Sequence, residues 1–587
     1  MRSVKYKTDV CVVGAGMSGI CAAVAAARHG AQVLLIHDRP VLGGNASSEI
    51  RMWICGAQGG DNPPNPDLLE TGIIEEIRLK NMYRNPYGNW SVWDSILYEM
   101  IWQESNIKLM ANCTCLDATT ERNRISSVTA WQMTTETRVC VEADIFIDCS
   151  GDGILIPLSG ADHRIGRESA AEYGEDIQPA DSDSKTMGMS CLIQTRKTDR
   201  PRSFIAPEWA TVYRTDEDLN NRPHDMTSHN FWWLELGGDR DSIHDAEDIK
   251  EDLIKASFGI WDHIKNRENH GADNWQLEWV GFLPGKRESR RYIGDYILTQ
   301  NDIRSEGRFD DLVAYGGWPM DDHHPAGLNF KGEPTVFHSV TAPYGIPYRC
   351  LYSRNIENLM CAGRNISVTH AALSSTRVMA TCSVIGQAAG TAAAMAAGSG
   401  VTPREIGRDR IRELQRRLME DDCYLPGEVR DRTALTRAAR ISATGSGRAE
   451  LIRDGIARNQ GTFLHGWTGR PSDAVTYEWD APQAVSGIRV VFDSNVNRGA
   501  FGKTTAVNMP CRYTPDMAEQ APPSSLVRAF RIEALCEDES WAVIYKEADN
   551  CQRMRKLKTE VKTRAIRLVV EQTWGDLAAT VFELDVC

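Results

Sequence analysis

A glycine cluster near the start of the chain has the spacing of a phosphate-binding turn. Gly14, Gly16 and Gly19 belong to the run GAGMSG at 14–19. The first glycine permits a tight turn, the second lets the backbone approach a pyrophosphate, and the third allows close packing of a helix on a strand. The free N–H groups of that helix attract negative charge. Gly14, Gly16, Met17, Ser18 and Gly19 are therefore predicted to hold a dinucleotide.

The elements around this turn make the signal specific. Residues 8–13 are rich in valine and predict a strand, 20–29 are rich in alanine and predict a helix, and 31–36 predict a second strand. A ribose-binding carboxylate normally follows about twenty residues after the glycines. His37 and Asp38 stand there, followed by Arg39. Either Asp38 or a neutral His37 is expected to bind the ribose hydroxyls, and a plain turn without ligand is the alternative to the whole motif.

Three separated stretches then resemble one protein family. They are DRPVLGGNASSEIR at 38–51, IFIDCSGDG at 145–153, and NLMCAGRNIS at 358–367, which continues through His370 and Arg377 into GQAAG at 386–390. Together they are similar to the FAD-dependent oxidoreductase family, which is distantly akin to the fumarate reductase and succinate dehydrogenase flavoproteins. The resemblance covers roughly residues 5–400, more loosely between about 165 and 335, and implies an FAD-dependent oxidoreductase.

The same resemblance implies a set of FAD-binding residues. In related flavoproteins the helix that begins near Arg377 aims its N–H groups at the pyrimidine end of the flavin ring, which becomes anionic on reduction. No second dinucleotide fingerprint appears, so the chain does not resemble a two-nucleotide reductase of the glutathione reductase type. Beyond the first glycine cluster, the implied FAD-binding residues are His37, Asp38, Arg39, Gly43, Gly44, Asn45, Ala46, Ser47, Ser48, Arg51, Cys115, Gly151, Asp152, Gly363, Arg364, Val378 and Met379.

Four residues are catalytic candidates. The resemblance places His370 close to the flavin, as an acid/base or as a donor to the substrate, and the alternative is a histidine that binds loop backbone. Tyr344 and Tyr348 lie in the proline-stiffened run APYGIPYR and are candidate proton donors. Arg291 is the fourth. It also belongs to a set of cationic side chains that could clamp a substrate carboxylate: Arg290, Arg291, Arg349 and Arg364.

Cysteine and histidine usage argues against a metal or a second redox centre. The 16 cysteines include no CxxC pair, so iron–sulfur and covalent haem sites lack their usual signs. Cys113 and Cys115 are expected to pack inside a strand. Cys55 is either a redox-active thiol or a buried, unreactive one. His323 and His324 resemble half a metal site without completing ligands. FAD is therefore the single cofactor expected, with no metal.

The pattern along the chain predicts an α/β fold with several domains. A Rossmann-like FAD-binding domain is expected in two parts, 1–165 and 336–402, with an inserted α+β substrate domain at 166–335. A helical connector would span 403–439. Short alternating runs after about 440 predict a β-sandwich of jelly-roll type at 440–587, and its closing segment TRAIRLVVEQTWGDLAATVFELDVC resembles discoidin-like, galactose-binding-like modules.

Charge and hydropathy restrict the partners. The net charge of −14 argues against binding to nucleic acid or anionic lipid. The first residues lack the apolar segment of a signal peptide, and 380–400 reads as a closely packed helix and not a membrane span. A cytoplasmic protein with a small-molecule substrate is expected. The sequence specifies neither the electron donor or acceptor nor the oligomeric state.

Three functions follow as alternatives. The first is hydride exchange between FAD and a small polar substrate, such as a carbohydrate or glycoside, a reading that depends on the abundance of tryptophan and on the C-terminal module. The second is an ene-reductase or dehydrogenase of a carboxylate-bearing metabolite. The third, of another class, is a non-catalytic carbohydrate-binding protein that keeps FAD as a structural group.

Overall fold

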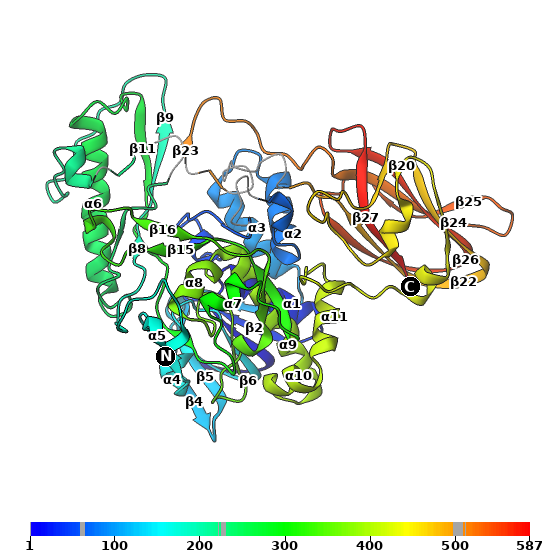
Figure 1. Ribbon diagram of the computed structural model, residues 1–587, viewed down its shortest axis with the longest axis horizontal. Coiled ribbons are helices and arrows are strands. Elements are labelled where there is room, and N and C mark those ends of the chain that lie inside the picture. The colour runs from blue at the N-terminus through cyan, green and yellow to red at the C-terminus, as the bar shows by residue number, and fades with distance from the viewer. Residues whose placement is uncertain (1, 59–64, 221, 225–229, 497–508, 511) are drawn as a thin grey trace. The chain divides into compact units, whose positions relative to one another are not determined.

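The computed structural model describes residues 2–58, 65–220, 222–224, 230–496, 509–510 and 512–587 (Figure 1). By its internal contacts the chain divides into two compact units. Unit 1 contains residues 1–62, 87–415 and 508–518, and unit 2 contains 63–86, 416–507 and 519–587. Each unit is described separately below.

Unit 1 is built on a seven-stranded sheet. Its strands run in the order β3-β2-β1-β6-β5-β4, and β18 also pairs with β6. The pairs β3–β2, β2–β1, β1–β6 and β6–β18 are parallel, whereas β4, β5 and β6 pair antiparallel. The bounds are β1 Arg2–Val13, β2 Val33–Ile36, β3 Ile107–Met110, β4 Cys113–Glu121, β5 Arg124–Gln132, β6 Thr137–Asp148 and β18 Leu359–Cys361.

Two helices pack tightly against each other in this unit. Helix α1 spans Met17–Arg28 and α9 spans Met379–Ser399. A Cβ added to Gly386 would lie 2.1 Å from the Ser18 carbonyl oxygen, and one on Gly390 would lie 2.1 Å from that of Ala22. Only glycine permits this approach, which explains the small residues of α9. Among the described residues no single helix is long and apolar enough to cross a membrane; α8, at His370–Thr376, and α9 reach the criteria only as a pair bent by 95°.

The middle of unit 1 forms small antiparallel sheets around its own core. The strand orders are β10-β8-β12 and β11-β9-β23, with the pairs β13–β7, β14–β17 and β15–β16. Helix α6, Ala246–Asn266, contributes Trp261 to an apolar core that also contains Trp233. The bounds are β7 His163–Arg164, β8 Met189–Ser190, β9 Ile193–Lys197, β10 Glu235–Leu236, β11 Trp275–Val280, β12 Gly285–Lys286, β13 Arg291–Tyr292, β14 Leu312–Gly316, β15 Met320–His323, β16 Thr335–His338, β17 Tyr344–Pro347 and β23 Arg512–Tyr513.

Shorter helices connect these elements. They are α3 Trp90–Trp102, α4 Leu155–Ser159, α5 Ala170–Tyr173, α7 Gln300–Arg304, α10 Pro403–Asp409, α11 Ile411–Glu420 and α12 Ala434–Ala438. Helices α10 to α12 fall within the stretch predicted as a helical connector.

Unit 2 is the antiparallel β-sandwich predicted from the alternating pattern. Its sheet runs β20-β21-β27-β22-β26-β24-β25, with β19 on β22, around one apolar core (Figure 1). Two long strands, β22 and β26, carry bulges where their register shifts. The bounds are β19 Arg440–Ala443, β20 Ser446–Gly447, β21 Trp467–Gly469, β22 Ala474–Phe492, β24 Val527–Leu535, β25 Trp541–Glu547, β26 Met554–Thr573 and β27 Ala579–Val586.

The predicted domain boundaries need two corrections. Helix α2, Ile73–Arg84, belongs to unit 2, because Leu79 is fully buried in the sandwich core and Glu75 accepts a hydrogen bond from Ser494. Residues 508–518 belong to unit 1, because β23 pairs with β9 and Gln194 donates to the Pro510 carbonyl at 3.1 Å. Neither 1–165 nor 440–587 is therefore a continuous domain.

Truncation near Gly427 tests the assignment of α2. Without the sandwich, Leu79 loses its buried surroundings, so the truncated chain should aggregate and its soluble yield should fall several-fold. Adding Leu79→Lys to the truncated chain should recover soluble protein, measured by gel filtration. A soluble truncated chain with a full complement of flavin would contradict the assignment and show that 63–86 folds without the sandwich.

Candidate cofactor site and active site

In the first glycine cluster, Gly16 has open space where a side chain would lie, whereas Gly14 and Gly19 do not. Cβ atoms added to Gly14 and Gly19 would lie 2.5 Å from the Cys149 carbonyl oxygen and 1.9 Å from that of Gly14, so the packing of the protein itself requires these glycines. A Cβ on Gly16, the N-cap of α1, would meet no atom within 4 Å. The open space at Gly16 faces the N-terminus of a helix, which fits a bound pyrophosphate.

The two ribose candidates after β2 differ in their contacts within the protein. The Ala15 N–H donates to His37 Nδ1 at 3.1 Å, and His37 Nε2 donates to the Val41 carbonyl at 2.9 Å. Burial lowers the pKa of His37, which fits a neutral ring. Both ring nitrogens are thus engaged with the backbone, whereas the Asp38 side chain is 58% exposed. The structure favours Asp38 for the ribose hydroxyls; Arg39 lies beside it, 3.9 Å from Glu49.

The second glycine cluster lies against the first. Gly43 and Gly44 have φ angles of 108° and 59°, and the Gly43 N–H donates to the Ala15 carbonyl at 2.8 Å. The rest of this segment is held by side chains of unit 1: Ala46 accepts from Trp93, Ser47 Oγ donates to Gly44, Ser48 N donates to Asp94, and Asn45 donates to the Lys286 carbonyl. The loop is therefore rigid where FAD-binding residues were predicted.

Arg51 is positioned by packing. Its guanidinium lies 4.4 Å from the ring centroid of Trp279 and 5.2 Å from that of Trp90. It also donates to the Ser48 carbonyl and, at 2.8 Å, to Gln194. These contacts make Arg51 a brace between the glycine loop and β9; direct binding of FAD by Arg51 stays a prediction.

The other predicted motifs converge at the carboxyl ends of β6 and β18. Asp152 accepts from Arg364 at 2.7 Å, from Lys286 at 2.7 Å and from Ser289 at 2.8 Å. Burial raises the pKa of Asp152, but Arg364 and Lys286 outweigh it and lower the pKa to about 2. A Cβ on Gly151 would lie 2.6 Å from the Arg364 guanidinium. Asp152 is thus a fixed carboxylate beside a glycine-lined turn.

Contacts with α1 complete this convergence. Ser18 Oγ donates to the Ala362 carbonyl at 3.0 Å, and a Cβ on Gly363, whose φ is 112°, would lie 3.0 Å from Ser18 Oγ. Val378 is the N-cap of α9, Met379 is its first residue, and the next N–H, from Ala380, donates to the Cys55 carbonyl. The three sequence stretches therefore meet around one site at the strand ends, as the resemblance implied.

Cys115 contributes differently from the other predicted FAD-binding residues. It is buried in β4, and burial raises the pKa of its thiol to about 12. The neighbouring Cys113 N–H donates to the His37 carbonyl at 2.7 Å, which ties β4 to the end of β2. Cys115 is a packing group in the sheet, so the structure gives its side chain no role in binding FAD.

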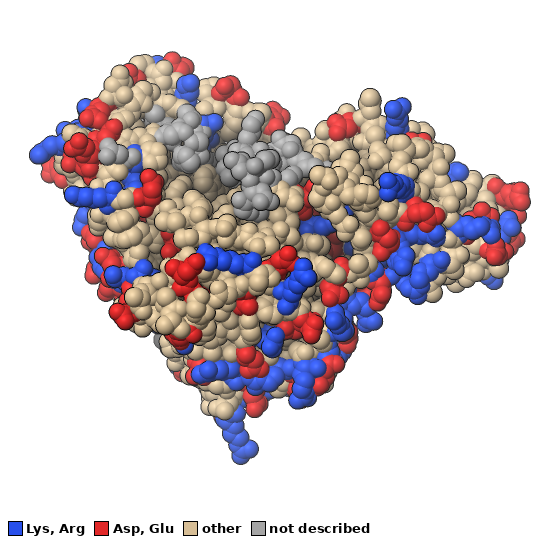
Figure 2. Space-filling view, in the orientation of Figure 1, with Lys and Arg blue, Asp and Glu red and all other residues tan. Residues whose placement is uncertain are grey.

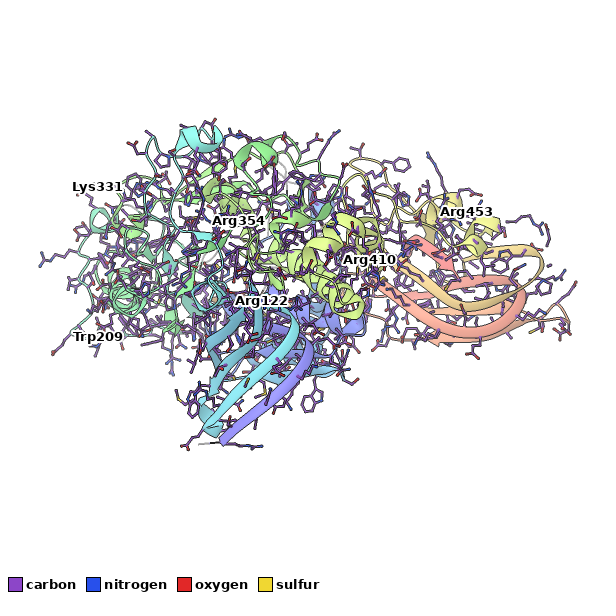
Figure 3. All side chains as sticks on the ribbon, turned by 90° about the horizontal axis from the view of Figure 1, so that it is seen from below. Arg122, Trp209, Lys331, Arg354, Arg410 and Arg453 are labelled. Carbon is purple, nitrogen blue, oxygen red and sulfur yellow. The ribbon has the colours of Figure 1, made fainter. Side chains whose placement is uncertain are left out.

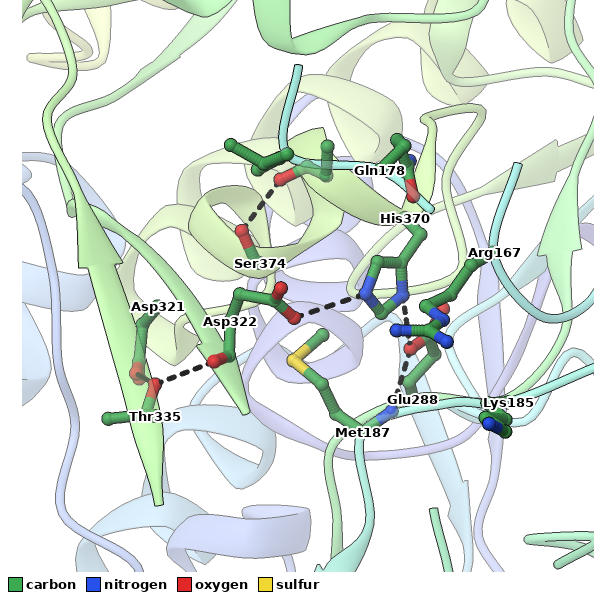
Figure 4. Close-up of polar contacts among 12 residues, drawn as sticks. Arg167, Gln178, Lys185, Met187, Glu288, Asp321, Asp322, Thr335, His370 and Ser374 are labelled. Carbon is green, nitrogen blue, oxygen red and sulfur yellow. Dashed lines mark hydrogen bonds and ion pairs between the residues drawn. The ribbon is translucent and has the colours of Figure 1, made fainter. Parts of the chain in front are cut away.

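His370 lies in a cage of carboxylates. Its Nδ1 lies 2.8 Å from Glu288 Oε2, its Nε2 lies 3.2 Å from Asp322 Oδ1, and its backbone N–H donates to Glu168 at 2.9 Å (Figure 4). Burial alone would lower the pKa of His370, but the charge of Glu288 and the hydrogen bonds to Glu288 and Asp322 raise it to about 10. His370 is therefore an imidazolium at neutral pH.

Arg291 lies next to two of the carboxylates of this cage. It is 1% exposed and lies 3.0 Å from Glu168 and 3.3 Å from Glu288. It is a positioning residue for the two carboxylates that hold His370. Nothing in the sequence around Glu288 indicates its contact with His370, which lies 82 residues away.

The tyrosine candidates are engaged elsewhere. Tyr348 is buried and donates to the Pro403 carbonyl at 3.0 Å, so it anchors the start of α10 and its catalytic role is not supported. The Tyr344 hydroxyl lies 2.5 Å from Ser375 Oγ, which in turn donates to the Trp318 carbonyl. Tyr344 thus contacts the short helix that begins at His370, but through its other end.

The His323–His324 pair does not form half a metal site. His323 lies 2.6 Å from Glu235 and 3.1 Å from Asp321, while the His324 ring stacks on Phe330 with centroids 3.6 Å apart. Burial would lower the pKa of His323, but Asp321 and Glu235 raise it. The two neighbouring imidazoles therefore have different partners and no common ligand.

Unit 2 contains a small polar cavity of its own. A pocket of about 40 Å³, open to solvent on one side, is lined by Glu75, Asp493, Arg458 and Arg553, among others. Small-molecule sites usually measure roughly 300–1,000 Å³. This cavity has room for about one water molecule, so it is too small for a sugar ring.

Comparisons with known proteins agree with the geometry of unit 1. The family model described as FAD dependent oxidoreductase matches residues 9–418. No curated protein sequence matches the chain. Among solved structures, a mutated E. coli quinol fumarate reductase FrdA is 14% identical with a TM-score of 0.29, covering 72% of this chain and 75% of that one.

Two carbohydrate-binding modules match a smaller share. The family 32 module of C. perfringens NanJ, in complex with galactose, is 12% identical with a TM-score of 0.19, covering 26% of this chain and 97% of that one. The family 32 module of Streptococcus pneumoniae EndoD is 13% identical, with the same TM-score and the same two coverages of 26% and 97%. At these TM-scores none of the structural likenesses carries an argument. The family model matches most of the chain, and the chain belongs to the FAD-dependent oxidoreductase family.

Proposed function

We propose that the enzyme exchanges a hydride between FAD and an uncharged, hydroxylated small molecule, such as a carbohydrate or glycoside. The observation that supports this choice is the pairing of the cationic side chains around the site. A substrate carboxylate would need unpaired arginine or lysine to bind it. Most arginines at or near the site already pair with carboxylates of the protein.

Three of the four arginines considered as carboxylate clamps are neutralised. Arg291 pairs with Glu168 and Glu288, Arg364 pairs with Asp152, and Arg349 donates two hydrogen bonds to Asp311 at 2.9 and 3.1 Å. Two further cations beside the His370 cage are paired as well: Arg167 with Asp183, and Arg377 with Asp321. Hydroxyl groups, which donate to carboxylates, suit such a site better than an acid does.

Asp322 is the carboxylate of this group that a small molecule can reach. Its side chain is 24% exposed, whereas His370 is 3% exposed and Glu288 is fully buried. Burial raises the pKa of Asp322, but the hydrogen bond and charge of His370, together with the charges of His323 and Arg167, outweigh burial and lower the pKa. Asp322 is thereby kept ionised and able to accept a proton or a hydrogen bond from a substrate hydroxyl. FAD, when bound, supplies the hydride acceptor or donor.

One observation favours a second candidate function. Arg290 contacts the Asp152 carbonyl at 3.5 Å, and among the described residues it forms no ion pair. A single unpaired arginine beside Asp152 could bind the acid group of a carboxylate-bearing metabolite. Reduction or dehydrogenation of such a metabolite is the alternative.

Anaerobic titration distinguishes the two. The purified yellow enzyme is mixed with neutral sugars and polyols in one series, and with hydroxy acids and enoates in the other, and the oxidised flavin band is followed. We expect a neutral substrate to bleach the flavin and Arg290→Gln to leave its KM within about twofold. Arg354→Gln is the control, because Arg354 is 52% exposed and pairs with Asp162 on the surface (Figure 3).

The opposite pattern supports the alternative. If only carboxylates bleach the flavin and Arg290→Gln raises KM at least about tenfold, a loss of about 1.4 kcal/mol, the substrate is an acid. If no member of either series changes the flavin, the proposed substrate class is wrong.

A further inference from the structure

We propose a structural zinc site in unit 1, formed by Asp216, His224, His263 and His270. It lies outside the FAD-binding segments and the His370 cage, in the middle region of the chain. Each of the four residues offers one ligand atom, and the four atoms lie within 4.8 Å of one another. The sequence alone gave no sign of it, because the ligands are spread over 55 positions and lack the short paired spacing of common zinc motifs.

Four of the six distances between the ligand atoms are close to the edge length of a tetrahedron around a metal ion. Asp216 Oδ1 lies 3.0 Å from His224 Nε2, 2.9 Å from His263 Nε2 and 3.5 Å from His270 Nε2. His263 Nε2 lies 3.2 Å from His270 Nε2. Ligand atoms about 2.0–2.1 Å from a zinc ion stand roughly 3.3 Å apart in a regular tetrahedron. The observed separations lie on both sides of this value.

The orientation of His263 points to a cation between the ligands. Its Nδ1 lies 3.2 Å from the Tyr213 carbonyl oxygen, so in the neutral ring the proton is on Nδ1. The lone pair on Nε2 then faces the Asp216 oxygen and the Nε2 of His270. These contacts are repulsive unless a proton or a metal ion lies between the atoms, and a single metal ion would relieve all of them at once. A second ring nitrogen that donates to a backbone carbonyl is also the usual support of a metal-bound histidine.

The ligand set indicates which ion fits. Three imidazoles and one carboxylate suit zinc and its neighbours among the transition metals, whereas calcium and magnesium prefer all-oxygen sites. Four protein ligands leave no open position, as in structural zinc sites. Asp216, with a side chain 47% exposed, gives an ion a path from solvent, while His263 is fully buried.

Such an ion would join three segments of the middle region. Asp216 begins the turn at Asp216–Leu219, His263 lies in the last turn of α6, and His270 follows that helix. Leu219 and Ile260 from these segments lie in the same apolar core. Trp209, half exposed and stacked edge-on against Phe258 of α6, marks the outer side of this helix (Figure 3). The metal would fix the Asp216 turn and the end of α6 over that core.

Metal analysis of the full-length flavoprotein tests the proposal. The protein is treated with a chelator, dialysed, titrated with Zn²⁺, and assayed by elemental analysis and calorimetry. We expect one Zn²⁺ per chain and a melting temperature that rises with Zn²⁺. His270→Ala and Asp216→Asn should each weaken binding at least about 100-fold, since loss of a mere supporting contact already costs 10–100-fold. His244→Ala is the matched control, because His244 pairs with Asp241 on the surface at 73% exposure and should bind Zn²⁺ like the wild type.

Binding of Co²⁺, followed by its visible spectrum, provides a second test in case a variant folds poorly. Co²⁺ bound to the wild type should show the visible bands of a tetrahedral ion, and His270→Cys should retain binding and add a thiolate-to-cobalt charge-transfer band. Flavin content in each sample reports that the chain is folded. Equal Zn²⁺ binding by folded wild type and His270→Ala, or octahedral cobalt spectra, would overturn the proposal and leave a cluster of histidines that share protons.

Discussion

A Gly16→Val variant should fold normally and purify without FAD. Gly16 has φ −65° and ψ 178°, an extended conformation that valine adopts without strain. Its added side chain would enter the open space at the N-terminus of α1, where the pyrophosphate is expected. We expect FAD affinity to fall at least about 100-fold, or about 2.8 kcal/mol, with an unchanged circular dichroism spectrum. The measurement is the ratio of flavin to protein absorbance after gel filtration.

Two further glycine variants serve as controls for this result. Gly398→Val is the control, because Gly398 is exposed near the end of α9 and its Cβ would also meet open space; this variant should keep its flavin. Gly19→Val should instead damage the fold itself, since its Cβ would lie 1.9 Å from the Gly14 carbonyl oxygen. A Gly16→Val protein with a full complement of FAD would show that the cofactor phosphates bind elsewhere.

The sequence predicted the cofactor and the family from local signals, whereas the individual FAD-binding residues stay a prediction. A glycine at a fixed spacing between a strand and a helix has few other uses, and the ends of parallel strands meet at one edge of a sheet. The contacts of Gly16 with Gly43, of Ser18 with Ala362, and of Arg364 with Asp152 are consistent with that topology. FAD as the cofactor and membership of the oxidoreductase family are confirmed by the family match.

The remaining errors concern contacts between distant residues. Helix α2 reads as part of the first domain, yet its apolar side completes the core of the sandwich, and nothing within 63–86 indicates this partner. His370 was identified, but its protonation state depends on Glu288 and Asp322, which are 82 and 48 residues away. Single-sequence patterns do not reveal which carboxylates face a histidine in the folded chain.

Replacement of His370 should produce the largest catalytic loss. His370 lowers the pKa of Asp322, which is the most exposed of the three carboxylates of the cage and the proposed contact with substrate. His370→Gln, which keeps one N–H donor, should slow flavin reduction by roughly 10²–10⁴-fold, the usual contribution of a positioned acid/base group. Its FAD content should match that of the wild type. His370→Ala would also remove the ion-pair partner of Asp322 and one of the two of Glu288, which keeps Arg291. Loss of a buried ion-pair partner costs about 3–5 kcal/mol in stability, so the glutamine variant is the cleaner test.

The pH dependence separates this role from that of an ordinary histidine base. The folded pKa of about 10 lies above the unfolded value of about 6.5. The stabilisation is therefore fully present below pH 6.5 and is lost as pH rises through about 10. Wild-type melting temperature should fall across this window, and His370→Gln should lack that slope. Glu288→Gln removes the charge that raises the pKa of His370 most, so the fall in melting temperature should move to lower pH.

The pH dependence of the rate of flavin reduction can contradict this role of His370. Flavin reduction by substrate should show no inflection near pH 6.5 in the wild type, because His370 keeps its proton there. An inflection near 6.5 that disappears in His370→Gln would mean that the imidazole titrates freely and acts as a base. A glutamine variant reduced at the wild-type rate would assign His370 to structure alone, and Asp322→Asn would then be the next variant to measure.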